Sequence, residues 1–455
     1  MDTICAISTA QGVGAIAVVR ASGPSAFEAA GRLFRPEAGI SGLPAQQVKF
    51  ARLYDREQLL DQVVIVKYAA PRSYTGEDMV EISCHGSLYI QKKILELLIE
   101  HGCRMAHPGE FTQRAFMNGK LDLPQAEAVG DLISSQSESS HKLAINQLQG
   151  NISRKLHQLR EELIQVASLL ELELDFSEED VAFADRDELA SLLGNIAAET
   201  ETLLQSFKIG NLLKTGIPVA IIGKPNVGKS TLLNALLQHD RAIVSQMPGT
   251  TRDTIEDTLT IQGTLFRFID TAGLRDTDNE VEQYGIERSY QAVQRASILL
   301  YLYDLTRQTE AEVTHELDAL GRQVDLSDKE VLVVANKTDI ALAAERPDRI
   351  AGFPVVCISA KEKTKTALVE ERLSAYVEQY AIHDAALLTN ERHYDLLRAI
   401  GQSVDNALQG LADGIPTDLL VEDIRAALAD MGTLTGTIST DDILNNIFGH
   451  FCIGK

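Results

Sequence analysis

The chain reads Gly223-Lys-Pro-Asn-Val-Gly228-Lys229-Ser230 near the middle of its 455 residues. The apolar run Val219 to Ile222 precedes this segment and a helical pattern, Thr231 to Gln238, follows it. This is the strand–loop–helix order that a GxxxxGK[ST] phosphate-binding loop requires. Glycines let backbone N–H groups curl around phosphate oxygens, while the lysine reaches the β- and γ-phosphates and the serine hydroxyl ligates Mg²⁺. The segment therefore predicts a nucleotide site in an α/β domain.

Four further motifs follow this loop, in the order expected of a GTP-binding domain. They are Pro248-Gly-Thr-Thr-Arg-Asp253, Asp270-Thr-Ala-Gly273, Asn336-Lys-Thr-Asp339 and Ser359-Ala-Lys361. Thr251 is placed to complete the Mg²⁺ shell, and Asp270 to act as a metal-side carboxylate and γ-phosphate sensor. Asp339 can accept from guanine N1 and N2, whose hydrogens adenine lacks, and backbone N–H groups of 359–361 can meet guanine O6. The set predicts GTP rather than ATP.

These motifs define the predicted nucleotide-binding residues. They are Asn226, Val227, Gly228, Lys229, Ser230, Thr231, Pro248, Gly249, Thr250, Thr251, Asp270, Thr271, Ala272, Gly273, Asn336, Lys337, Asp339, Ser359, Ala360 and Lys361. Ser230 and Thr251 are the predicted Mg²⁺ ligands, because this hard cation prefers oxygen.

Two positions indicate how hydrolysis is activated. Many small GTPases place a glutamine after the DxxG glycine to orient the attacking water, whereas this chain has Leu274, which cannot hold water. The neutral amide of Asn226 suits a monovalent cation between the β- and γ-phosphates. Potassium there can supply the charge of an arginine finger, an effect of about 10³–10⁵ in rate. An asparagine in this loop can equally stabilise a turn.

Composition excludes several classes of protein. The net charge is −23, from 42 basic and 65 acidic residues, so an RNA partner needs a local basic patch or a second, basic subunit. The five cysteines contain no CxxC pair, which disfavours a zinc ribbon or a disulfide framework and fits a reducing cytosol. No signal peptide or membrane span is evident. We expect a cytoplasmic protein.

The pattern of apolar and polar residues divides the chain into about three domains, the number that its length suggests. Residues 1–118 read as α+β, with strands at Ile16–Val19, Val63–Val66 and Met79–Ile82 and a helix at Tyr89–Glu100. Residues 119–215 are helical and 216–377 alternate strands and helices, which predicts a mostly parallel sheet. Residues 378–455 are helical again. The simplest account is an all-α bundle split by an inserted α/β P-loop domain.

One long apolar stripe supports the helical bundle. It comprises Leu148, Ile152, Leu156, Leu159, Leu163, Val166 and Leu170, at spacings of three and four. This spacing predicts a single helix of about six turns that packs through one face. The acidic run Glu171 to Asp180 then predicts a solvated loop or helix end. Ile400, Val404, Leu408 and Leu411 predict a helix after the insert.

The GTP-binding motifs resemble those of the TrmE-Era-like GTPases. Three other segments narrow the resemblance to the MnmE (TrmE) family of tRNA-modification GTPases, and it covers essentially the whole chain. They are Pro108-Gly-Glu-Phe-Thr-Gln-Arg-Ala-Phe116, Gly119-Lys-Leu-Asp-Leu-Pro-Gln-Ala-Glu127 and the terminal Phe451-Cys-Ile-Gly-Lys455.

The resemblance implies a function and partners. With the flavoprotein MnmG, which carries FAD, such proteins add an aminomethyl or carboxymethylaminomethyl group to C5 of wobble uridine-34 in certain tRNAs. A tetrahydrofolate derivative (5-formyl or 5,10-methylene) supplies the one-carbon unit. The family forms homodimers through folate-binding-like N-terminal domains, and its G domains pair when GTP and K⁺ are bound, which activates hydrolysis.

The resemblance also implies roles for particular residues. Asn226, Ser245, Met247 and Thr250 match K⁺ ligands, and Ser245, Gln246 and Met247 join the nucleotide-binding set. Glu282 matches the glutamate that positions the attacking water. Arg20, Glu77, Lys120 and Lys455 match folate-binding positions, and Cys452 matches a functional thiol. Without the family match, we would expect Glu282 and the folate positions to be surface charges, and Cys452 to be a small buried apolar residue. Cys452 is also four residues from the end, the spacing of a prenylation motif, but Gly454 and Lys455 disfavour such a motif.

Two other classes of function compete with this one. A GTP-switched RNA-binding or ribosome-assembly factor would carry an RNA module with a GxxG loop and a basic face, and neither is found. A stand-alone folate-dependent transferase with a regulatory G domain is the third hypothesis. It differs from the first in needing no flavoprotein partner.

Overall fold

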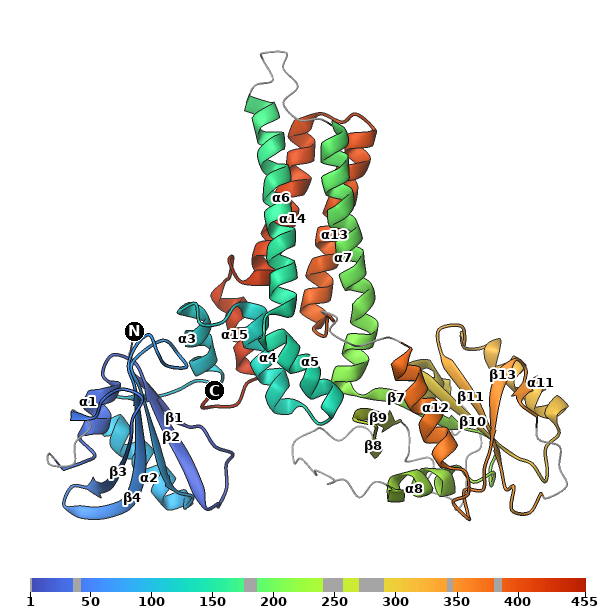
Figure 1. Ribbon diagram of the computed structural model, residues 1–455, viewed down its shortest axis with the longest axis horizontal. Coiled ribbons are helices and arrows are strands. Elements are labelled where there is room, and N and C mark those ends of the chain that lie inside the picture. Colours follow the sequence, from blue (N-terminus) through green and yellow to red (C-terminus); the bar gives the residue numbers. More distant parts are fainter. Residues whose placement is uncertain are drawn as a thin grey trace. The chain divides into compact units, whose positions relative to one another are not determined.

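The computed structural model describes residues 2–35, 42–175, 186–239, 257–269, 290–341, 347–379 and 387–455. The chain divides into two compact units (Figure 1). The first comprises residues 1–133, 145–202 and 391–455, and the second comprises 134–144 and 203–390. Segments on both sides of 203–390 thus belong to one unit.

The N-terminal part of the first unit is a six-stranded sheet with helices on one face. Its strands are β1 (Ile4–Ile7), β2 (Ile16–Ser22), β3 (Val48–Asp55), β4 (Gln58–Tyr68), β5 (Met79–His85) and β6 (Arg104–Met105), in the order β3-β4-β5-β2-β1-β6. Alternate residues such as Val19 and Ile82 are buried under α1 (Ala26–Gly31) and α2 (Leu88–Glu100). The three predicted strands and the predicted helix are confirmed.

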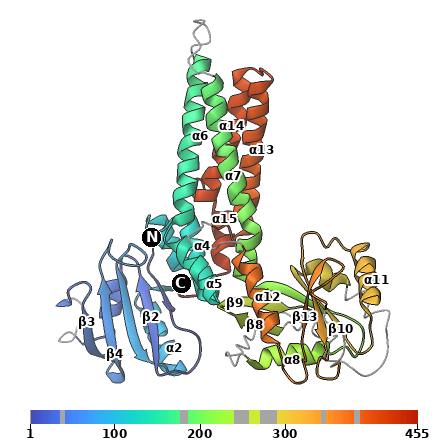
Figure 2. The same ribbon diagram turned by 45° about the vertical axis from the view of Figure 1, so that its right-hand side comes forward.

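Helices form the rest of the first unit. They are α3 (Glu110–Met117), α4 (Leu123–Ser134), α6 (Asn151–Asp175), α13 (Glu391–Ala412), α14 (Thr417–Thr435) and α15 (Asp441–Gly449); α5 (Glu138–Leu148) and α7 (Arg186–Thr215) each run across the boundary between the units. Figures 1 and 2 show α6 and α14 side by side. The predicted helix after the insert is confirmed as α13, in which Ile400 and Val404 are fully buried.

The predicted single helix from Leu148 to Leu170 is wrong at its start. Leu148 ends α5, and Gly150 takes φ +79°, a left-handed conformation that breaks the helix before α6 begins at Asn151. From Ile152 to Leu170 the stripe is buried along α6, as expected. The helix also runs through Glu171 to Asp175, so the first half of the acidic run is a helix end; the second half lies outside the described residues.

The second unit holds a seven-stranded sheet in the order β12-β13-β11-β10-β7-β9-β8. The strands are β7 (Ile217–Ile222), β8 (Asp257–Ile261), β9 (Thr264–Phe268), β10 (Ile298–Asp304), β11 (Glu330–Asn336), β12 (Arg349–Ile350) and β13 (Phe353–Cys357), with α8 (Lys229–His239), α11 (Glu310–Gly321) and α12 (Ala367–Glu378) among the described helices. Every pair from β13 to β9 is parallel, and only the edge strands β12 and β8 pair antiparallel. The predicted mostly parallel sheet is confirmed.

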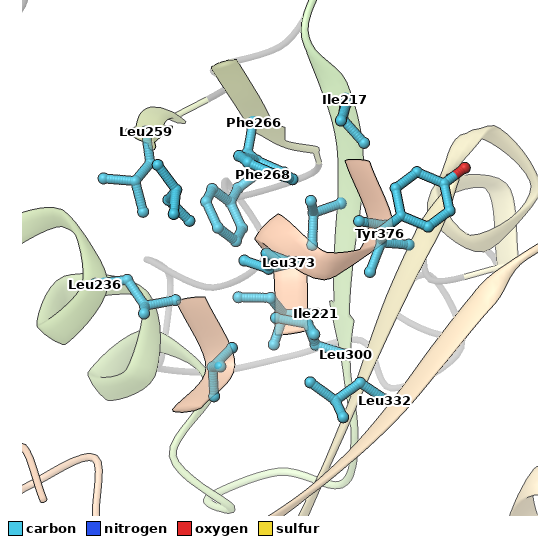
Figure 3. Packing of buried hydrophobic residues seen from close by; sticks show 14 of the residues in the cluster. Ile217, Ile221, Leu236, Leu259, Phe266, Phe268, Leu300, Leu332, Leu373 and Tyr376 are labelled. Atoms are coloured by element: carbon cyan, nitrogen blue, oxygen red, sulfur yellow. The ribbon is translucent and has the colours of Figure 1, made fainter. Parts of the chain in front are cut away.

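Burial on both faces explains the apolar strands of this sheet. All seven residues of β10 are buried, because side chains on the two faces of the strand pack into different apolar clusters. Leu300 packs with Phe266 and Leu373 on one face, and Leu299 packs with Val293 and Val331 on the other. Figure 3 shows the first cluster, where Phe266 and Phe268 from β9 lie beside Leu259, Ile217 and Ile221.

Removal of Phe266 is expected to destabilise the second unit strongly. The ring is fully buried, so Phe266→Ala removes its packing and leaves a cavity, a loss of about 3–5 kcal/mol in the free energy of unfolding. Urea titration followed by circular dichroism measures this loss. Leu368→Ala is the control, because Leu368 is 38% exposed. Equal losses in the two variants would contradict the packing described here.

Candidate functional site

The predicted phosphate loop lies between β7 and α8, and two of its glycines are required by close contacts. Gly223 has φ +147°, and a Cβ there would lie 2.1 Å from the carbonyl oxygen of Leu302 on β10. Gly228 has φ +104°, and a Cβ there would lie 2.3 Å from Nδ2 of Asn336. No side chain fits at either position without displacing the backbone or its hydrogen bonds.

Lys229 lies inside this loop. Its Nζ donates to the carbonyl oxygens of Gly223 at 2.6 Å and Lys224 at 3.1 Å. Burial lowers the pKa of Lys229, since desolvation disfavours the ammonium. The loop thus holds a cation where it can meet phosphate oxygens. Ser230 follows in the first turn of α8, and Thr231 is exposed.

The predicted guanine motif is joined to the phosphate loop by Asn336, which is only 3% exposed. Its Nδ2 donates to the carbonyl oxygen of Val227 at 2.7 Å, and its Oδ1 accepts from the N–H of Ala360 at 2.9 Å. One amide therefore ties three predicted motifs together.

The lysine and aspartate of the same motif are also fixed. Lys337 donates from Nζ to Asp304 at 2.7 Å and to the carbonyl oxygen of Asn226 at 3.1 Å. Ser359 donates from Oγ to Asp339 at 2.6 Å, which orients the carboxylate expected to read guanine. Lys361 is exposed. The structure thus brings together the described part of the predicted nucleotide site.

Asp304 contacts this group of residues, although none of the sequence motifs includes it. It ends β10, is 2% exposed, and accepts from Lys337 and Thr306. Burial alone would raise the pKa of Asp304, but the Lys337 ammonium and the Thr306 donors outweigh it and hold the pKa below its ordinary value. An acidic residue at the carboxyl end of a fully apolar strand was the available signal.

Part of the predicted site lies outside the described residues. This part comprises Ser245, Gln246, Met247, Pro248, Gly249, Thr250, Thr251, Asp270, Thr271, Ala272, Gly273 and Glu282, together with Leu274.

A second polar cluster surrounds the predicted folate positions in the N-terminal sheet. Arg20 on β2 donates to Oε1 of Glu81 from Nε at 3.0 Å and from Nη2 at 2.7 Å. Its guanidinium lies 5.3 Å from the ring centroid of Tyr74 and 5.5 Å from that of Phe111. Arg20 is therefore not a free surface charge but one side of an aromatic-lined ion pair.

Glu77 is likewise held in place. Its side chain is 12% exposed and lies 3.2 Å from Nη1 of Arg114, and Oε2 accepts from Oγ of Ser22 at 2.8 Å. Three of the roughly four lone pairs of the carboxylate are occupied, so bidentate binding of a pterin requires Arg114 or Ser22 to give way. Lys120 is exposed and donates to the carbonyl oxygen of Pro71 at 3.1 Å.

The C-terminal tail docks beside this cluster. The N–H of Phe111 donates to the carbonyl oxygen of Lys455 at 3.2 Å, and the N–H of Gly109 donates to that of Cys452 at 3.4 Å. Gly454 has φ +97°, and a Cβ there would lie 2.1 Å from the carbonyl oxygen of Ile7, so the tail fits closely against β1. Cys452 is exposed, which contradicts the reading of a small buried hydrophobe.

Acid is expected to weaken this part of the first unit through Glu110. Its Oε1 lies 2.6 Å from Arg104 and 3.0 Å from Arg114. Burial alone would raise the pKa of Glu110, but the two arginines and the N–H of His107 hold the pKa below its ordinary value. The stabilisation is then present above the unfolded pKa and lost as the pH falls through the lower folded pKa. The melting temperature should fall between about pH 5 and pH 3, and less steeply in Glu110→Gln; parallel curves would contradict this.

Two family models match the chain over nearly its full length. The GTP-binding protein TrmE N-terminus matches residues 3–120, and the MnmE helical domain matches residues 123–452. The tRNA modification GTPase MnmE of Parabacteroides distasonis is 46% identical over 467 residues, covering all of both chains. That of Cytophaga hutchinsonii is 46% identical over 460 residues, covering 100% of this chain and 98% of the relative.

The chain belongs to the MnmE family of tRNA modification GTPases. The resemblance inferred from the motifs is thereby confirmed over the full length, with MnmE relatives such as that of Flavobacterium johnsoniae at 45% identity. Among solved structures, the FeoB G-domain from Methanococcus jannaschii matches at 27% identity and a TM-score of 0.26, over 35% of this chain and 96% of that chain. So low a score carries no inference. Within the described residues, no helix is apolar and long enough to traverse a membrane.

Proposed function

We propose that this protein hydrolyses GTP and uses the cycle to modify tRNA, as the names of its MnmE relatives state for them. The observation that carries the proposal is the amide of Asn336, whose two hydrogen bonds join the phosphate loop at Val227 to the guanine-facing loop at Ala360. Asp339, held by Ser359, is the proposed reader of guanine N1 and N2. Lys229 is the proposed ligand of the β- and γ-phosphates.

Two metal ions complete the proposed GTP site. Ser230 and Thr251 are the proposed Mg²⁺ ligands. Potassium is proposed at Asn226, Ser245, Met247 and Thr250, where it would offset charge that develops on the phosphates. In support, the Asn226 amide is exposed and makes no hydrogen bond within the described residues, while its backbone is held by Lys337. Glu282 is the proposed group that positions the attacking water, a role that Leu274 cannot fill.

The second cluster is the proposed site for a tetrahydrofolate derivative. Charged groups of both signs and the rings of Tyr74 and Phe111 fit a flat, polar-edged heterocycle with an anionic tail. Arg20, Glu77, Lys120 and Lys455 are the proposed ligands. The folate would supply the one-carbon unit. Cys452, exposed on the docked tail, is the proposed reactive thiol at the uridine.

We further propose that the protein works as a homodimer with a flavoprotein of the MnmG type, in the cytoplasm. The hairpin β3–β4 at the sheet edge is a suitable surface for binding a second copy of the chain. It carries three exposed apolar side chains on one face, Val48, Phe50 and Val64, with exposed fractions of 67%, 63% and 37%. The net charge of −23 favours a partner that brings basic surface for tRNA.

Nucleoside mass spectrometry of tRNA tests the function. Cells lacking the protein should lose C5-aminomethyl-type wobble uridines, and the unmutated chain should restore them. Lys229→Ala should not restore them, because the variant lacks the proposed phosphate ligand and cannot complete the GTP cycle. Cys452→Ser should not restore them, because it lacks the proposed reactive thiol. An unchanged profile in the deletion strain would overturn the tRNA-modification function and favour a ribosome-assembly role. Rescue by Cys452→Ser would remove only the thiol from the proposal.

A further inference from the structure

A buried ion cluster in the helices of the first unit has no part in the sites described above. Glu127 on α4 lies 2.9 Å from Nη2 of Arg392 through Oε1, and 2.5 Å from Nε2 of His393 through Oε2. The side chains are 9%, 23% and 3% exposed, respectively. Arg392 also donates from Nη1 to the carbonyl oxygen of Thr433 on α14 at 3.2 Å. Arg392 on α13 therefore contacts both α4 and α14.

Stability alone does not account for this cluster. Burial alone would raise the pKa of Glu127, but His393 and Arg392 outweigh it and hold the pKa below its ordinary value, so the carboxylate is charged. Desolvation of buried charges offsets most of their attraction, and apolar residues of the same size are often as stabilising. Within the described residues, neither ring nitrogen of His393 makes a contact with hydrogen-bond geometry, although Nε2 lies close to Oε2 of Glu127. In some proteins, buried ionic groups instead select one arrangement of the packed helices.

One end of the cluster lies where the chain leaves the nucleotide-binding unit. Residues up to 390 belong to the second unit, and α13 begins at Glu391, so Arg392 and His393 are in its first turn. Leu388, just before this helix, is held within the second unit. Its N–H donates to Oγ of Ser206 at 3.1 Å, and a Cβ added at Gly210 would lie 2.0 Å from its carbonyl oxygen. Only two residues of the chain therefore separate this anchored segment from the first turn of α13.

The other end of the cluster leads to the C-terminal tail. A Cβ on Gly130, three residues after Glu127 on α4, would lie 3.1 Å from the ring of Phe451, which adjoins Cys452. Leu123 and Ala126 pack with Leu444 and Phe448 of α15. The same short helix thus carries both the buried carboxylate and the surface on which the tail rests.

We propose that Glu127 is a positioning residue for the tail. Through Arg392 and His393 it ties α4 to the first turn of α13, so that the nucleotide state of the second unit sets the placement of Cys452 and Lys455. This inference rests on the proposed function, in which that tail takes part in tRNA modification. Helix shifts at packed interfaces are an established means of such coupling.

The test uses the full-length protein with its flavoprotein partner and compares three variants. Glu127→Gln keeps size and removes charge. Arg392→Lys keeps charge but loses the fork that contacts both Glu127 and Thr433, and it serves if the first variant folds poorly. Glu171→Gln is the control, because its pair with Arg425, which joins α6 to α14 in the same unit, is about half exposed. The readouts are GTP hydrolysis, tRNA modified per GTP, and hydrogen exchange of residues 448–455 with GDP or a non-hydrolysable GTP analogue.

Glu127→Gln should hydrolyse GTP normally yet modify about 5- to 150-fold less tRNA per GTP, the usual range of coupling between sites. Hydrogen exchange of residues 448–455 in this variant should no longer depend on which nucleotide is bound. The control variant should behave like the unmutated chain. Retained nucleotide dependence in both cluster variants, or its absence in the unmutated chain, would overturn the inference. Failure of the unmutated chain to hydrolyse GTP or to modify tRNA would instead overturn the proposed function.

Discussion

Gly228→Ala is expected to weaken GTP binding by roughly 10²–10⁴-fold, from backbone strain of about 1–3 kcal/mol and a lost buried hydrogen bond of similar cost. The added Cβ would lie 2.3 Å from Nδ2 of Asn336. That nitrogen donates to Val227, so the phosphate loop and the guanine motif cannot both keep their places. Titration with a fluorescent GTP analogue measures the effect.

Gly352→Ala is a matched control for this substitution. Gly352 lies in the same unit with φ +83°, but a Cβ there meets nothing within 4 Å. Gly352→Ala therefore introduces the same kind of backbone strain as Gly228→Ala but no close contact with a neighbouring atom. If both variants bound GTP equally well, the contact between Gly228 and Asn336 would not be what holds the loop. Melting curves of the two variants separate lost binding from lost folding.

Exchange of potassium for sodium is expected to slow GTP hydrolysis by up to about 10³–10⁵-fold, the effect of an arginine finger in related enzymes. Asn226→Ala should be slow in either salt, because the side-chain oxygen that holds K⁺ is gone. The backbone of Asn226 has φ +64°, which asparagine tolerates better than alanine, so strain must be separated from ligation.

Two further variants make this separation. Asn226→Gly relieves the strain but has no oxygen, and Asn226→Asp keeps an oxygen at the same place. Potassium activation retained by aspartate and lost by glycine would support ligation. Recovery of potassium activation in Asn226→Gly would show that the backbone conformation is what matters. Equal rates of the unmutated chain in both salts would refute a potassium site.

Local spacing in the sequence was enough to predict much of the fold. Runs such as Ile298 to Tyr303 are apolar at every position, because both faces of a central parallel strand are covered. The prediction of a mostly parallel sheet was correct. The order of motifs from Gly223 to Lys361 placed the described nucleotide residues at one site. The break at Gly150 was missed, since a periodic stripe does not reveal that one glycine takes a left-handed conformation.

Contacts between distant residues were decided only by the tertiary structure. Arg20 and Glu77 read as isolated charges, and only folding pairs them with Glu81 and Arg114, 61 and 37 residues away. Glu127 and His393 are 266 positions apart, with the nucleotide-binding unit between them in the chain. Periodicity reports which face of an element is buried but not what it meets there. The sequence by itself therefore determined the elements and the chemistry of the nucleotide loop, whereas the partners of each buried charge followed from how distant segments pack.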